Sequence, residues 1–91
     1  MEKLELLQRV QAELLNHDEL FELRPRVKLS FDEEKLIVHY RHPTTGRAGS
    51  MVAGVVRDVQ REERRMTAEI VQRLRGRGRS KPFETLITPE P

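Results

Sequence analysis

The C-terminal part of this sequence holds the residues with the clearest capacity for chemistry. From residue 73 to residue 81 every second position is a base, and the segment contains no acid. Cations spaced along a glycine-containing segment contact phosphates one by one, which gives salt-dependent binding with little sequence preference. We therefore predict contact with nucleic acid through Arg73, Arg75, Arg77, Arg79 and Lys81. The alternative is a solvated basic segment, or one that contacts another anionic surface.

A second group of cations belongs to an expected β-hairpin. Apolar and polar residues alternate over residues 26–31 and 36–41, and Asp32-Glu33-Glu34 separates the two runs as a turn. Successive strand residues point to opposite faces, so this pattern predicts one apolar face and one polar face. The expected apolar positions are Val27, Leu29, Phe31, Leu36, Val38 and Tyr40. The expected polar positions are Arg26, Lys28, His39 and Arg41.

This polar face is the second predicted nucleic-acid contact, through Arg26, Lys28 and Arg41. A basic sheet face can lie along a phosphate backbone, but proteins that bind single strands also present aromatic rings on which bases stack. The aromatic residues Phe31 and Tyr40 have the parity of the apolar face instead. The alternative interpretation is an ordinary solvated sheet face.

Patterns that indicate catalysis or metal binding are missing from the sequence. There is no cysteine, which excludes disulfides, thiol chemistry and cysteine-type zinc sites. His17, His39 and His42 lack the spacing of metal ligands, and no serine lies in a Gly-X-Ser-X-Gly motif. Residues 44–50 lack the Gly-Lys-Ser/Thr ending of a phosphate-binding loop. We therefore expect no enzymatic activity, no cofactor and no metal.

Charge is distributed unevenly along the chain. Residues 1–23 hold six acids and two bases, whereas residues 24–81 hold fifteen bases and seven acids. A net charge of +2 thus conceals a strongly positive central part, and this asymmetry favours an anionic partner. No apolar stretch reaches the roughly 20 residues of a membrane span, and the N-terminus is charged, so we expect a cytoplasmic protein.

Ninety-one residues suffice for one domain. Leucines and valines spaced by three and four predict a helix over residues 2–16.

Residues 48–56 have two interpretations. We favour a single helix over residues 51–75, because apolar residues continue at helical spacing from Val52 to Leu74. Such a helix would extend roughly 37 Å, farther than the other elements can cover, which favours a homodimer.

The alternative for residues 48–56 is a third strand, since Gly54 and the valines weaken a helix there. The element order would then be shared in outline with double-stranded-RNA-binding domains and some small nucleoid-associated proteins, although none of the residue motifs of the former is present. This is an analogy of fold alone and carries little weight for function.

The sequence predicts an α+β fold with an N-terminal helix, an antiparallel hairpin and a long C-terminal helix. Residues 48–56 or 83–88 are the candidates for a third strand. We expect one domain over residues 1–75 and a basic, then apolar tail over residues 76–91, with Gly76 ending the last helix. The predicted function is nucleic-acid binding. The alternative is a protein-interaction or regulatory module that acts as a homodimer, with residues 83–88 docking a protein partner.

Overall fold

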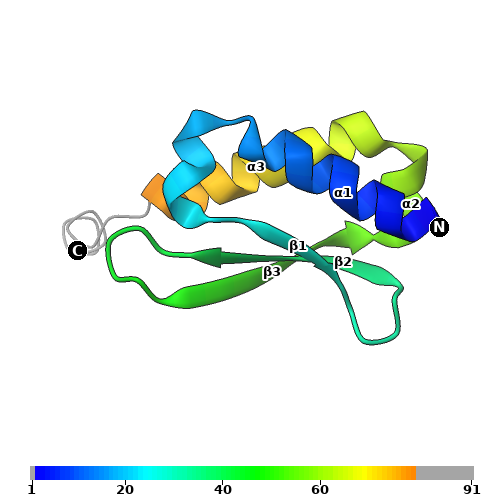
Figure 1. Ribbon diagram of the computed structural model, residues 1–91, viewed down its shortest axis with the longest axis horizontal. Coiled ribbons are helices and arrows are strands. Elements are labelled where there is room, and N and C mark those ends of the chain that lie inside the picture. Colours follow the sequence, from blue (N-terminus) through cyan, green and yellow to red (C-terminus); the bar gives the residue numbers. More distant parts are fainter. Residues whose placement is uncertain (1, 80–91) are drawn as a thin grey trace, which may run out of the picture.

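A computed structural model describes residues 2–79 of the chain. Two layers make up the fold, with a three-stranded sheet below and helices above it (Figure 1). The described part is therefore α+β, as the sequence predicts. The helical elements are α1 (Glu2–Leu15), the 3₁₀ helix η1 (Asp18–Leu23), α2 (Val56–Arg61) and α3 (Glu63–Arg79), and the strands are β1 (Arg26–Leu29), β2 (Lys35–Arg41) and β3 (Ala48–Val55).

The sheet is antiparallel, with the order β1-β2-β3. The turn between β1 and β2 is closed by Asp32, whose carboxylate accepts hydrogen bonds from the Ser30 hydroxyl at 2.6 Å and from the Glu34 N–H at 3.0 Å. Beyond the other end of β2, the His42 N–H donates to the Arg47 carbonyl at 2.8 Å. The predicted helix over residues 2–16 and the predicted hairpin are both confirmed.

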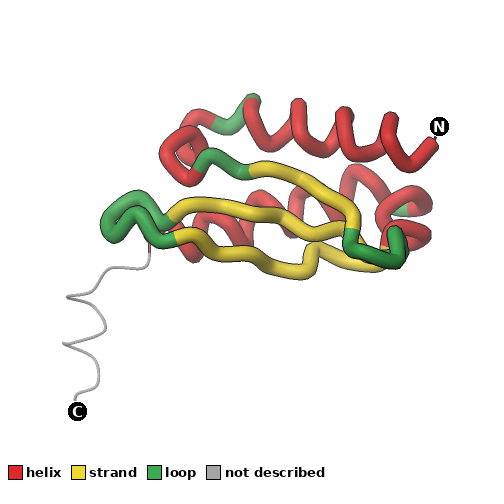
Figure 2. The backbone as a smooth tube through the Cα atoms, turned by 60° about the horizontal axis from the view of Figure 1, so that its bottom comes forward, coloured by secondary structure: helices red, strands yellow, loops and turns green. Residues whose placement is uncertain are grey.

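Within residues 2–79, the helices all lie on one face of the sheet, and no described element covers the opposite face (Figures 1 and 2). The core between the two layers is aliphatic, and its fully buried members include Leu6, Val38, Ile70 and Leu74. Burial of such side chains contributes roughly 1.5–3 kcal/mol each, and this is the main force that holds helices to sheet. No helix within residues 2–79 combines the length and the apolar character that a membrane crossing requires.

The favoured helix over residues 51–75 is wrong in its first part. Residues 48–55 form β3, which completes the sheet, and the chain becomes helical only at Val56. A short α2 follows, and the helix breaks at Glu62 before α3 begins. The core covers the apolar side of α3, since Ile70, Val71 and Leu74 are all buried. The long helix over residues 51–75 does not form, so its uncovered end no longer supports a homodimer.

Two smaller predictions also fail. Phe31 was expected on the apolar face, but β1 ends at Leu29 and the Phe31 ring is fully exposed in the turn. Gly76 does not end the last helix, because α3 continues to Arg79 and thus extends past the expected domain boundary at residue 75. The predicted strand at 83–88 lies outside the described residues.

Candidate nucleic-acid interface

The face of the sheet opposite the helices carries a group of cations. By strand alternation, Arg26 and Lys28 of β1 point to this side, as do Lys35, His39 and Arg41 of β2, and the structure leaves all five exposed. We call this surface the outer face. Residues two apart on one strand are about 6.6–6.8 Å apart, close to twice the 3.4 Å axial rise between phosphates of one DNA strand.

The middle of the outer face is apolar and small. Lys28 of β1 lies opposite Ile37 of β2, which in turn lies opposite Val52 of β3. Arg26 pairs in the same way with His39, and His39 with Ser50. The cations thus surround a short aliphatic centre, and none of the three strands contains an acid.

The cations of the outer face have no carboxylate partners, in contrast to most of those in the helical layer. Within residues 2–79, no salt bridge involves Arg26, Lys28, Lys35 or Arg41. Arg41 instead donates one hydrogen bond to the Gly46 carbonyl at 2.7 Å, which leaves most of its five donors available. Within the described residues, no ion pair therefore neutralises these cations, although Asp32 in the neighbouring turn interacts electrostatically with Lys35.

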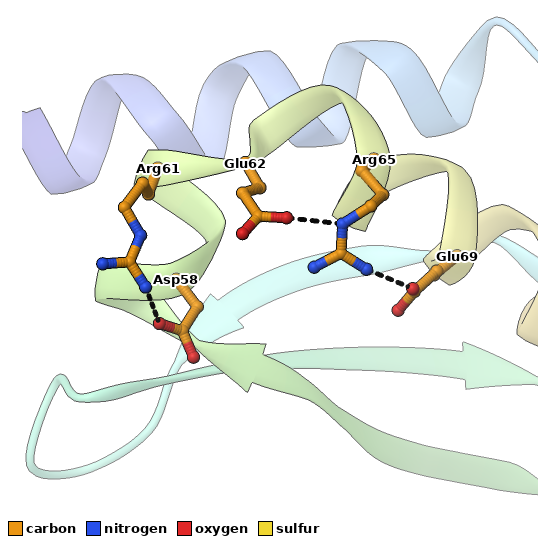
Figure 3. Close-up of polar contacts among 5 residues, drawn as sticks. All are labelled: Asp58, Arg61, Glu62, Arg65 and Glu69. Carbon is orange, nitrogen blue, oxygen red and sulfur yellow. Dashed lines mark hydrogen bonds and ion pairs between the residues drawn. The ribbon is translucent and has the colours of Figure 1, made fainter.

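Figure 3 shows two arginines of the helical layer that, unlike the cations of the outer face, are paired with carboxylates. Arg61 pairs with Asp58 at 3.3 Å, and Arg65 lies between Glu62 and Glu69, with 2.7 Å to the latter. The hydrogen bond from Arg65 to Glu62 and the nearby carboxylates raise the pKa of that guanidinium above its usual value. These arginines are engaged with acids of their own helices, so they offer little unneutralised charge to a partner.

Of the basic segment 73–81, the structure describes the side chains of Arg73, Arg75 and Arg77. Residues two apart on a helix lie about 200° apart around its axis and residues four apart about 40°, so α3 directs Arg73 and Arg77 to one side and Arg75 to the other. Arg73 donates to the Val52 carbonyl at 3.1 Å, at the edge of the sheet. Arg75 pairs with Glu19 on the helical side. The Arg79 side chain and Lys81 lie outside the part of the chain whose side chains are described.

Arg77 fastens the end of α3 to the sheet. Its guanidinium lies 5.5 Å from the centre of the Tyr40 ring and donates to the Tyr40 hydroxyl at 3.1 Å. Tyr40 points to the helical side, where its ring covers Gly49 of β3. Arg77 therefore has a structural role, and the strand positions of the outer face carry no Phe, Tyr or Trp, with His39 as their one aromatic ring.

A groove of about 830 Å³ lies between α1 and α3, on the side of the molecule away from the sheet. Most of its charged residues are already paired, as Arg9 with Glu63 at 2.9 Å across the groove and Arg75 with Glu19 at its end, and Arg64 is the lining cation without a recorded ion pair. The pKa of Glu19 is lowered by a hydrogen bond from its own backbone N–H and then by Arg75. This internal pairing makes the groove a weaker candidate for an anionic ligand than the outer face.

Sequence reasoning missed one cation that belongs to the candidate interface. Lys35 is the first residue of β2 and lies on the outer face. The alternation of Arg41, His39 and Ile37 along the strand extends back to Lys35, so this residue was detectable from the sequence.

The described residues contain no group of three or more His, Asp or Glu side chains placed to hold a metal ion. Comparison of the chain with protein-family models, with curated proteins and with solved structures found no match in any of the three. Any functional proposal therefore depends on the geometry of the chain itself.

Proposed function

We propose that this protein is a non-enzymatic, cytoplasmic nucleic-acid-binding protein that uses the outer face of its sheet. The observation that carries the proposal is that the sheet cations of this face have no ion-pair partner within residues 2–79, whereas Arg61, Arg65 and Arg75 of the helices do. Arg26, Lys28, Lys35 and Arg41 share one exposed face with no carboxylate partner among residues 2–79. Neutralising phosphates is the main source of affinity for proteins that bind nucleic acid without sequence preference.

Two further features favour nucleic acid over other partners. A second copy stacked on this face would bring cations against cations, and like charges across an interface are costly. The spacing of the cations along each strand also suits a regular row of phosphates better than an irregular acidic protein surface. His39 is the one aromatic ring among the strand positions of the outer face, so base stacking adds little, and we expect the duplex backbone to be bound at least as well as a single strand.

Fluorescence anisotropy with a labelled duplex of random sequence tests the proposal. Four phosphate contacts give a slope of log affinity against log salt of about −3.6, so affinity falls roughly 150-fold between 50 and 200 mM salt. Replacing the four residues by glutamine should abolish this dependence and most of the binding. The substitutions are Arg26→Gln, Lys28→Gln, Lys35→Gln and Arg41→Gln.

The matched control changes four helical cations, which alters the net charge equally but leaves the outer face intact. Its substitutions are Arg57→Gln, Arg61→Gln, Arg64→Gln and Arg65→Gln. We expect it to retain binding and a slope near that of the unaltered protein. Absence of binding at 50 mM salt, or equal losses in the two variants, would contradict the proposal.

A further inference from the structure

The two edges of the sheet are protected very differently. On the β1 side, the Gln11 side chain takes the place of a neighbouring strand: its amide donates to the Pro25 carbonyl at 2.8 Å, and its carbonyl accepts from the Val27 N–H at 2.8 Å. β1 is also only four residues long and includes Arg26 and Lys28. Short length, charge and a covering side chain are the usual protections of an edge strand.

The β3 edge has almost none of these protections. β3 is eight residues long and contains neither a charged residue nor a proline. Small residues, Ala48, Gly49 and Ser50, make up its first part. Among the residues that the structure describes, the side chain recorded on this edge is that of Arg73, which reaches the Val52 carbonyl. A long uncharged edge of this kind is a template for another strand.

The backbone groups that face outward on β3 follow from the register. His42 and Arg47 form a hydrogen-bonded pair, so Ala48, Ser50 and Val52 fall in the non-hydrogen-bonded pairs with β2. Their N–H and C=O groups therefore point away from β2, which agrees with the bond that Val52 accepts from Arg73. The outward N–H and C=O groups of these three alternate residues can form antiparallel hydrogen bonds with a strand that also presents them on every second residue.

We infer that β3 of one copy pairs antiparallel with β3 of a second copy, with Ser50 opposite the partner's Ser50. The two sheets then form one six-stranded sheet whose outer faces are continuous. Ala48 lies opposite the partner's Val52, and the Val52 carbonyl has a second lone pair for this bond beside that used by Arg73. The strand is neutral, so this arrangement avoids the like-charge contact that face-to-face stacking would create.

Residues 83–88 of the same chain are the other candidate for pairing with the edge of β3. The chain leaves the described region at the end of α3, which Arg77 holds beside Tyr40, at the end of the sheet where β3 begins. A strand that follows from there on β3 of the same molecule would run parallel to it, and parallel pairing is slightly less stable per residue. The second copy, which pairs antiparallel, is therefore the better occupant.

Charge exchange at Ser50 tests this pairing in the full-length chain. Ser50 is exposed, so Ser50→Lys and Ser50→Glu should both fold. In a dimer centred on this residue, each variant alone faces its own charge, and we expect dimerisation weakened about fivefold in sedimentation velocity. A mixture of the two variants should recover it, because opposite charges then face one another.

Hydrogen exchange of the outward amides separates the two occupants. In the dimer, the amides of Ala48, Ser50 and Val52 should gain protection as the protein concentration rises. A protein that is monomeric at every concentration would overturn the inference, and amides protected independently of concentration would assign the edge to the chain's own tail. A dimer of equal strength in both variants and their mixture would also overturn it. None of these results depends on nucleic-acid binding.

Discussion

Replacing Gly49 by alanine should destabilise the protein, although the backbone of Gly49 does not require glycine. A Cβ at this position would lie 2.7 Å from Cζ and 2.8 Å from the hydroxyl of Tyr40, its cross-strand partner. Optimal carbon contacts are about 3.5–4.0 Å, so the ring has to withdraw by roughly 1 Å. The ring is held on its other side by Arg77, and it packs against the core.

The expected cost combines two opposing effects. Overpacking of this kind costs about 1–3 kcal/mol, whereas alanine gains about 0.4–1 kcal/mol by restricting the unfolded chain. The net loss is therefore centred at about 1.3 kcal/mol, which lowers the midpoint of thermal unfolding by roughly 5–10 °C for a domain of this size. Circular dichroism with heat or urea measures the change.

Two controls make this reasoning refutable. Gly76→Ala adds a methyl group where the structure has open space, within α3, so it should stabilise by up to about 1 kcal/mol. In a Tyr40→Ala background the ring is gone, and Gly49→Ala should then cost nothing. If Gly49→Ala were as stabilising as Gly76→Ala, or equally harmful without the ring, the contact with Tyr40 would not be the cause.

Two further predictions concern the turn and the protected edge. Hydrogen bonds from the Ser30 hydroxyl and, second, from the Glu34 N–H hold the pKa of Asp32 below its usual value. The ionised carboxylate therefore stabilises the fold fully above about pH 3.9. This stabilisation is lost as the pH falls through the lower pKa that Asp32 has in the folded state. Asp32→Asn should weaken the dependence of the urea midpoint on pH between about pH 2 and pH 5. If the urea midpoint of the variant changed with pH as steeply as that of the unaltered protein, this prediction would be contradicted. Gln11→Ala removes both hydrogen bonds to the β1 edge and should cost roughly 1–3 kcal/mol in urea unfolding, whereas Gln8→Ala, on the exposed side of α1, should change stability by less than about 0.5 kcal/mol. Equal losses of stability in the two variants would show that the hydrogen bonds from Gln11 to the edge of β1 do not stabilise the fold.

Sequence patterning was sufficient where a regular period was undisturbed. The alternation over β1 and β2 identified the faces of Arg26, Lys28 and Arg41 correctly, since strand parity depends only on the backbone. From Val56 onward the helical spacing was also correct. Apolar residues that recur at steps of three and four over such a length are typical of a helix with one buried side.

The error at β3 has a physical cause in a β-bulge. Leu36 pairs with Gly54 and Ile37 with Val52, so Ala53 is an extra residue in the ladder. Val52 and Val55 consequently share the outer face although they are three residues apart, a step that imitates a helix. A local pattern cannot reveal this, because the hydrogen bonds that β3 forms with β2 come from a distant part of the sequence.

The arginines of α3 show a different limit. Their alternate spacing favoured an extended basic segment, and Gly76 favoured the end of a helix. The contact between Arg77 and Tyr40 joins residues 37 positions apart and fixes the last turns of α3 against the sheet. The helix directs Arg75 to the side opposite Arg73 and Arg77, and these two arginines contact the sheet, so the three do not act together as they would on an extended chain.

The bulge also determines which changes of length β3 can accept during evolution. Loss of Ala53 would restore regular pairing and leave Val52 and Val55 facing outward and Met51 facing the core. Loss of one residue between Ala48 and Met51 would exchange the two faces before that point. Deletions in relatives of this chain should therefore be accepted at residue 53 and selected against a few residues earlier.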